Sequence, residues 1–180
     1  GSAEKTGTLN EVRQALGERS FLEFGGIEAN PTFETLMKSV KVIKENNIDF
    51  LLAVGGGSVI DGVKFVAAAA LFEGDAWDIL LKRGSNIKAA LPFGSVLTLP
   101  ATGSEMNCGS VITRKEFKAK LAFGNPAVYP KFSILDPTKT FSLPQRQLAN
   151  GLVDAYVHIA EQYLTYPVNS PIQDRFAEGL

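Results

Sequence analysis

The chain has 180 residues, of which 45% are hydrophobic and 21% charged, and its formal net charge is -1. This balance is typical of globular proteins and gives no indication of binding to nucleic acid or to an anionic membrane surface. The only cysteine, Cys108, cannot form a disulfide within the chain, which indicates a reducing, cytoplasmic environment. The polar first residues predict no signal peptide, and no apolar run is long enough to span a bilayer.

Strands and helices are predicted to alternate along most of the chain. The first expected elements are a helix, a strand and a second helix, over residues 8–16, 20–24 and 31–47. Asn30 is the predicted N-cap of the second helix, with Pro31 at its first position. A buried strand over 50–54 and an Ala-rich helix over 58–72 follow, and Trp77 is expected to pack down the polar segment after them. Further strands are expected over residues 95–99, 111–113, 121–123 and 132–135. This alternation predicts an α/β fold with a doubly wound parallel sheet.

The pattern changes near Pro137 and is helical from Pro144 onward. Six apolar residues there share one helical face: Leu152, Val153, Tyr156, Val157, Ala160 and Leu164. Pro167 and Pro171 bracket a break, after which residues 173–180 begin another helix. We therefore predict an α/β domain over residues 1–143 and the beginning of an all-helical domain over 144–180.

Three glycines and a serine, Gly55-Gly56-Gly57-Ser58, connect the buried strand to the Ala-rich helix. Glycines allow the backbone to approach a ligand closely, and the first N–H groups of a helix point toward an anion bound there. The turn therefore predicts a phosphate-binding site, with Ser58 as a possible N-cap. The alternative is a tight connection between strand and helix that binds no ligand.

A second candidate site is the segment 98–105, Thr-Leu-Pro-Ala-Thr-Gly-Ser-Glu, which follows another predicted strand. Ligands of open α/β sheets bind beyond the carboxyl ends of parallel strands, so its hydroxyl and N–H groups could bind a nucleotide. The alternative is a capping box formed by Thr102 and Glu105. The usual dinucleotide fingerprint is not met, because Ile60 stands where it requires glycine or alanine.

Asp154 and His158 are four residues apart, on one face of a predicted helix. A carboxylate and an imidazole in this arrangement can bind one divalent transition metal, although a solvent-facing polar pair is the alternative interpretation. Lys120, between two short apolar segments, could contact a phosphate or a ribose, or could simply be solvated. No side chain is predicted to be catalytic apart from this metal site.

Together these motifs resemble the iron-containing (group III) alcohol dehydrogenase family, and most closely its NADPH-dependent butanol dehydrogenase and aldehyde reductase branch. The resemblance covers essentially the whole chain, including residues 23–31 and 173–179. It implies a dehydroquinate synthase-like N-terminal domain whose first strand is absent, because Gly1-Ser2 matches the end of a further glycine-rich loop in that branch. It also implies that this chain is part of a longer enzyme and is inactive alone.

The resemblance implies the following site residues. The cofactor NADP(H), or alternatively NAD(H), would be contacted by Ser2, Asn30, Gly55, Gly56, Gly57, Ser58, Thr98, Thr102, Asn107 and Lys120. Asp154 and His158 would be two of the four ligands of iron or zinc, and the other two, both histidines, lie further along in family members. In NAD-preferring relatives an aspartate stands near the position of Ser2, so Ser2 favours NADPH.

The activity implied is metal-dependent, NAD(P)H-linked interconversion of alcohols and aldehydes by a cytoplasmic homodimer. The metal would act as a Lewis acid on the carbonyl oxygen of a small-molecule substrate. Two alternatives stay open at this point. One is a glycerol dehydrogenase-like or dehydroquinate synthase-like enzyme, and the other is a nucleotide-binding fragment without catalysis.

Overall fold

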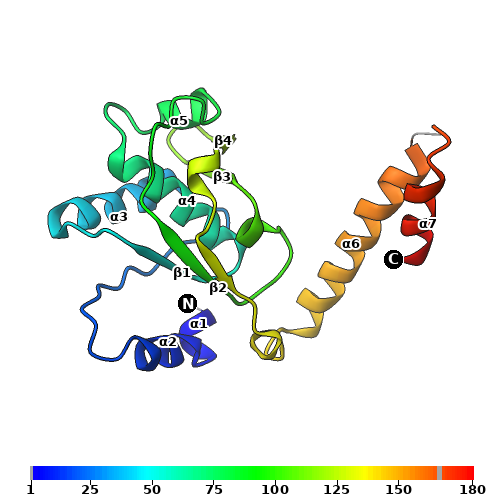
Figure 1. Ribbon diagram of the computed structural model, residues 1–180, viewed down its shortest axis with the longest axis horizontal. Helices are drawn as coiled ribbons and strands as arrows, with labels where there is room; N and C mark the ends of the chain where they lie inside the picture. Colours follow the sequence, from blue (N-terminus) through cyan, green and yellow to red (C-terminus); the bar gives the residue numbers. More distant parts are fainter. Residues whose placement is uncertain (1, 166–167) are drawn as a thin grey trace. The chain divides into compact units, whose positions relative to one another are not determined.

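The computed structural model describes residues 2–165 and 168–180, with the side chain of Ser2 left out. The chain divides into two compact units, with the division between Phe141 and Ser142. Figure 1 shows the sheets of the first unit and the two helices of the second. Among the described residues, no helix is both long enough and apolar enough to cross a membrane.

The main sheet of the first unit has three parallel strands in the order β1-β2-β5 (Figure 1). These strands are β1 (Leu51–Gly55), β2 (Phe93–Leu97) and β5 (Phe132–Ile134). Gly55 lies opposite Leu97 in the register, so β1 and β2 end side by side. The predicted α/β fold with a parallel sheet is confirmed, although β2 begins two residues before the expected position.

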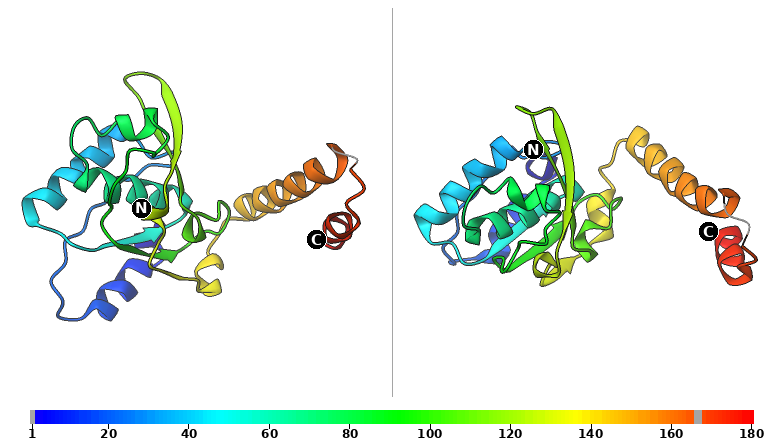
Figure 2. Two further views of the ribbon diagram at one scale, coloured as in Figure 1. Left: turned by 45° about the horizontal axis from the view of Figure 1, so that its top comes forward. Right: turned by 90° about the horizontal axis from the view of Figure 1, so that it is seen from above.

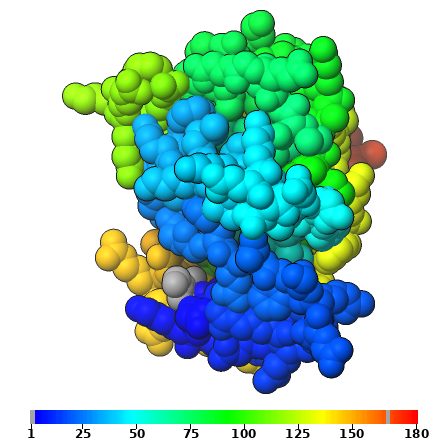
Figure 3. All heavy atoms as spheres, turned by 90° about the vertical axis from the view of Figure 1, so that its left-hand side faces the viewer, coloured from blue at the N-terminus to red at the C-terminus, as the bar shows by residue number. Residues whose placement is uncertain are grey.

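Helix α4 (Gly57–Leu71) packs on β1 and β2 and against α3 (Phe33–Asn46), as Figures 1 and 2 show. The outer surface of α3 covers the middle of the face seen in Figure 3. Phe65 of α4 is fully buried, and its ring lies 5.7 Å from that of Phe33. Trp77 is 4% exposed and packs edge-on against Phe33, which confirms that it holds down the segment containing the short helix α5 (Asp78–Leu81).

The strands β3 (Gly109–Arg114) and β4 (Ala119–Gly124) form a separate antiparallel pair that packs against α4. The expectation that these segments belong to the parallel sheet was wrong. Only four residues connect them, and parallel strands need a crossover of a dozen residues or more. The hairpin places Lys120 opposite Thr113, which is bridged to Thr32 just before the start of α3.

The strand predicted over residues 20–24 does not form. Residues 19–28 have no regular structure, between α2 (Thr8–Leu16) and α3. The side chains of Phe21 and Leu22 are 42% and 56% exposed, and no described strand pairs with this segment. A strand needs a hydrogen-bonded neighbour, so the apolar composition alone is insufficient. The helix predicted over 8–16 is confirmed and is preceded by the short α1 (Ser2–Lys5).

The second unit consists of α6 (Gln145–Thr165) and α7 (Pro171–Gly179). Two of its predicted apolar residues, Leu152 and Tyr156, are 66% and 71% exposed on α6. Helix α7 begins at Pro171, two residues before the expected start, because proline is well suited to the first helical position. The predicted break at Pro167 lies outside the described residues.

Candidate functional site

The glycine-rich turn lies between the end of β1 at Gly55 and the start of α4 at Gly57. Gly56 is the N-cap, so the prediction of Ser58 as N-cap was wrong. The N–H groups of Val59 and Ile60 both donate to the Gly56 carbonyl, at 3.0 and 3.2 Å. The N–H groups of Gly57 and Ser58 precede them and therefore have no acceptor within the helix. This end of α4 can bind an anionic group such as a phosphate.

The loop that follows β2 contacts this turn. The Thr98 N–H donates to the Gly55 carbonyl at 3.0 Å. A Cβ atom added to Gly57 would lie 2.2 Å from Thr102 Oγ1, and one added to Gly56 would lie 3.4 Å from Leu99 Cβ. Gly57 is thus required for the close approach of the two loops. This approach places Thr98 and Thr102 beside the first turn of α4.

The alternative interpretation of Thr102 and Glu105 as a capping box was wrong, because Gly103 is the N-cap of the short helix that follows. Thr102 Oγ1 accepts a hydrogen bond from the Ser104 N–H at 3.3 Å and so stabilises the short 3-10 helix η1 (Ser104–Met106). Glu105 does not reciprocate, because its Oε2 atom is buried without a hydrogen-bond partner among the described residues. Thr102 itself is exposed beside the turn.

Asn30 and Lys120 form the third part of the site. Lys120 Nζ donates to Asn30 Oδ1 at 2.7 Å, and the Asn30 N–H donates to Ser58 Oγ at 3.4 Å. Asn30 has a φ of 58°, a left-handed conformation that asparagine tolerates better than most residues. The N-cap of α3 is therefore Thr32 and not Asn30, whose side chain contacts Lys120. These contacts bring an amide and an ammonium group to the N-terminal end of α4.

Asn107, another predicted cofactor contact, is turned toward the protein. Its Oδ1 atom accepts hydrogen bonds from Lys64 Nζ and from the Gly109 N–H, both at 2.9 Å. Asn107 therefore orders the loop between η1 and β3. Its Nδ2 atom lies 3.5 Å from the Thr102 carbonyl, at the limit of a hydrogen bond.

Sequence reasoning assigned no role to Lys64 or Asp61. Lys64 is fully buried, and its ammonium group donates to Ser104 Oγ, Asn107 Oδ1 and the Gly109 carbonyl. Asp61 accepts from Ser104 Oγ at 2.6 Å and from the Val111 N–H at 3.1 Å. The signal was available, because a lysine between Val63 and Phe65 in an apolar helix must find buried partners.

Burial lowers the pKa of the Lys64 ammonium from 10.5 to about 8, against the opposing effect of the negative charge of Asp61. The group is still protonated at neutral pH. Three hydrogen-bond acceptors surround it, which matches the three protons of an ammonium group.

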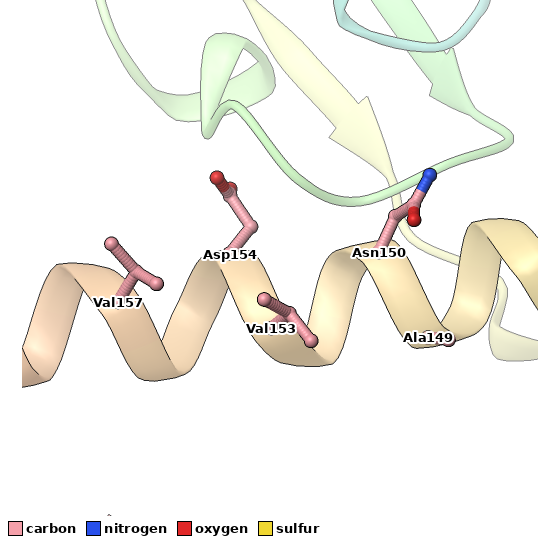
Figure 4. Close-up of a pocket in the computed structure, with 5 residues that line it drawn as sticks. All are labelled: Ala149, Asn150, Val153, Asp154 and Val157. Carbon is pink, nitrogen blue, oxygen red and sulfur yellow. The ribbon is translucent and has the colours of Figure 1, made fainter.

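The remaining predicted residues are Ser2, Asp154 and His158. Ser2 begins α1, but its side chain lies outside the described part of the chain. Asp154 and His158 lie on α6 in the second unit, with His158 Nε2 3.7 Å from Asp154 Oδ2. Asp154 lines an open hollow on α6 with Asn150 and Val153, and Figure 4 shows these side chains projecting from the helix.

The chemistry of this pair fits a divalent transition metal. Bonds of about 2.1 Å in tetrahedral geometry place two ligand atoms about 3.4 Å apart, close to the observed separation of the Asp154 and His158 atoms. A carboxylate oxygen and an imidazole nitrogen are ligands that iron and zinc accept. The described residues include no group of three or more side chains able to bind a metal ion, so this pair is at most part of a site.

Comparison with known proteins identifies the family of the chain. The family model for iron-containing alcohol dehydrogenases matches residues 1–137. The chain belongs to the iron-containing alcohol dehydrogenase family. This matched region includes the glycine-rich turn, the loop after β2 and the hairpin that carries Lys120. The resemblance inferred from the motifs is thereby confirmed.

Individual members of the family are similar over the whole chain. The NADPH-dependent aldehyde reductase YqhD of Escherichia coli is 58% identical over 182 residues, which is 100% of this chain and 47% of that protein. A probable NADH-dependent butanol dehydrogenase of Bacillus subtilis is 52% identical with the same coverage. The crystal structure of the E. coli protein matches 99% of this chain and 46% of that one, with a TM-score of 0.92 at 57% identity. The chain thus spans about half the length of the relatives it matches.

Proposed function

We propose that the protein is a metal-dependent oxidoreductase that interconverts aldehydes and alcohols with a nicotinamide cofactor. The observation that carries this proposal is that three segments lie together at the N-terminal end of α4. These are the glycine-rich turn, the loop after β2 with Thr98 and Thr102, and the hydrogen-bonded pair of Asn30 and Lys120. Ligands of α/β sheets bind at this edge, and the chain belongs to a dehydrogenase family.

Each segment has a distinct role in cofactor binding. The N–H groups of Gly57 and Ser58 bind the pyrophosphate, because they lack helical acceptors and lie at the positive end of α4. Gly55 and Gly56 keep the backbone accessible to it. Thr98 and Thr102 bind the adenosine side, and Asn30, Lys120 and Asn107 complete the site, with Asn107 fixing its loop.

The metal site is proposed in the second unit. Asp154 and His158 would bind iron or zinc together with histidines of the remaining helical domain, so residues 1–143 would form the nucleotide-binding domain and 144–180 the beginning of the metal-binding domain. When bound, the metal supplies a Lewis acid for the substrate oxygen, and the nicotinamide supplies the hydride. No other side chain of the chain is assigned a catalytic role.

The substrate class and setting follow from the family. Relatives named for NADPH-dependent aldehyde reduction and for butanol oxidation support small alcohols or aldehydes as substrates. We propose NADP(H) as the cofactor, with NAD(H) as the alternative, and a cytoplasmic homodimer.

Two measurements test this function. The 180-residue chain is titrated with NADPH, whose fluorescence changes on binding, and NADPH oxidation in the presence of butanal is followed in the protein extended to the length of its relatives. We expect saturable NADPH binding by the chain and turnover by the extended protein that is lost on treatment with a chelator. Absence of binding of both NADPH and NADH would refute the nucleotide site.

A second candidate function is a nucleotide-binding module without catalysis. It is favoured by the lack of a complete metal-binding cluster among the described residues. In that case NADPH binds, but the extended protein shows no metal-dependent turnover with any small aldehyde. The same pair of measurements therefore separates the two functions.

A further inference from the structure

Lys64 and Asp61 lie one helical turn apart on α4 and form a polar cluster inside the first unit. Lys64 is 0% exposed, and its Nζ atom donates to Ser104 Oγ at 2.8 Å, to Asn107 Oδ1 at 2.9 Å and to the Gly109 carbonyl at 2.8 Å. Ser104 Oγ in turn donates to Asp61 Oδ1 at 2.6 Å, so it links the ammonium to the carboxylate. Every proton of the buried ammonium group thus has an acceptor.

All partners of this cluster belong to one stretch of chain. Ser104 lies in η1, Asn107 follows it, and Gly109 begins β3. The second oxygen of Asp61 accepts a hydrogen bond from the N–H of Val111, two residues further along β3. The two side chains therefore attach residues 104–111, the second half of the connection and the start of β3, to α4.

The cluster lies between the segments proposed to bind the cofactor. The first turn of α4, with Gly57 and Ser58, is on the same helix as Lys64. Thr102 is two residues before Ser104, and Lys120 lies opposite Thr113 on the hairpin that the cluster attaches. Lys64 and Asp61 therefore link the helix that begins at the turn to both the loop and the hairpin.

A stabilising role alone does not account for a buried lysine. Burying a charge is costly, and an apolar residue of similar volume is often at least as stabilising as a buried ion pair. An ammonium group that binds three acceptors in one loop instead selects a single conformation for that loop. Without Lys64, Asn107 Oδ1 would retain only the Gly109 N–H, and Ser104 Oγ only Asp61.

We propose that Lys64 is a positioning residue that, together with Asp61, holds the loop of residues 98–109 in the conformation that binds the nicotinamide cofactor. This inference rests on the proposed nucleotide site. Lys64 itself, being fully buried, does not contact the cofactor.

The test is a titration of the 180-residue chain and its variants with NADPH, combined with thermal unfolding and hydrogen exchange. Lys64→Met preserves the side-chain volume but removes the charge and the three donors. We expect its NADPH dissociation constant to rise about tenfold or more, and the amides of residues 102–109 to lose exchange protection. Ser104→Ala, which removes only the hydroxyl shared by Lys64 and Asp61, is expected to raise the constant about threefold and serves if Lys64→Met does not fold.

Ser110→Ala is the matched control. Ser110 is also buried, and its hydroxyl donates to the Asp61 backbone carbonyl at 2.8 Å, but in the described part of the chain that hydroxyl makes no hydrogen bond to Lys64 or to the loop residues that Lys64 binds. We expect lower thermal stability with NADPH affinity within about twofold of the wild type. If Lys64→Met folds and binds NADPH with wild-type affinity, the positioning role is overturned. If Lys64→Met does not fold, wild-type affinity in Ser104→Ala overturns it instead. A loss of NADPH affinity in Ser110→Ala as large as that in the test variant also overturns it. Failure of the wild type to bind either cofactor instead refutes the proposed function.

Discussion

Lys120 Nζ donates a hydrogen bond to Asn30 Oδ1 at 2.7 Å, although the two residues are 90 positions apart in the chain. This contact joins the antiparallel hairpin to the segment before α3, beside the first turn of α4. Asn30 is the only hydrogen-bond acceptor of Lys120 in the described part of the chain, which leaves two of its three protons for a ligand. An exposed ammonium group at the positive end of a helix is well placed for an anion.

Lys120→Met should weaken cofactor binding. The substitution removes the charge near the proposed pyrophosphate site and the bond that fixes Asn30. We expect the NADPH dissociation constant to rise about tenfold, equivalent to ~1.4 kcal/mol, as measured by fluorescence titration. Both side chains are exposed, so the melting temperature should change little.

The matched control for this change is Lys118→Asn. Lys118 is exposed at the tip of the same hairpin with a φ of 49°, a conformation that asparagine tolerates. The substitution removes the same positive charge from a residue that is not part of the proposed site, and NADPH affinity should stay within about twofold of the wild type. Equal weakening by both variants would show that only the net charge of the hairpin matters.

Gly57→Ala tests the contact between the glycine-rich turn and the loop after β2. The new methyl group would lie 2.2 Å from Thr102 Oγ1, so the exposed Thr102 side chain must move. We expect the NADPH dissociation constant to rise about tenfold with a change in unfolding free energy of about 1 kcal/mol or less. Gly25→Ala is the control, because a Cβ atom there meets nothing within 4 Å. Unchanged affinity in Gly57→Ala would remove the turn from the proposed site.

The sequence predicted the position of this site better than the long-range contacts that surround it. The buried run before Gly55 and the Ala-rich helix after it specify the strand, the turn and the helix locally, and each formed close to the expected residues. Residues 20–24 have the composition of a strand but no neighbour to pair with, which depends on tertiary structure. The contacts of Lys64 with Ser104 and Asn107 span 40 and 43 residues, and no local pattern encodes such pairs.

The low pKa of Lys64 should affect stability at alkaline pH. Burial lowers the pKa to about 8 in the folded protein, from 10.5 in the unfolded chain. Between these values the unfolded state binds more protons than the folded state, so the contribution of Lys64 to stability rises with pH from about 8 to 10.5. The measurement is the free energy of unfolding of the wild type minus that of Lys64→Met across this range. The difference should increase with pH, and a constant difference would show that the pKa of Lys64 is not lowered.

Ser2 is proposed to determine the choice between the two nicotinamide cofactors. An aspartate at this position would repel a 2′-phosphate, so Ser2→Asp should shift preference from NADPH toward NADH. We expect the ratio of the two dissociation constants to change about tenfold or more toward NADH, in titrations of the wild type and the variant. Glu4→Gln, which alters charge on the same short helix α1, should leave the ratio unchanged. A wild type that binds both cofactors equally would contradict the role of Ser2.

The last prediction concerns Asp154 and His158. Their side chains are 63% and 69% exposed, and Nε2 and Oδ2 are 3.7 Å apart, so the pair can bind one ion at two of its positions. Two protein ligands leave most of the hydration shell of the ion in place, and catalytic sites commonly use three.

The 180-residue chain should therefore bind Zn²⁺ weakly, and His158→Ala should weaken that binding about tenfold further, as measured by calorimetry. Asp174→Asn removes a carboxylate from α7 in the same unit and should leave Zn²⁺ binding unchanged. NADPH affinity should be the same in all three proteins, because the proposed cofactor site lies in the first unit. Equal Zn²⁺ binding by the wild type and His158→Ala would identify the pair as an ordinary surface contact.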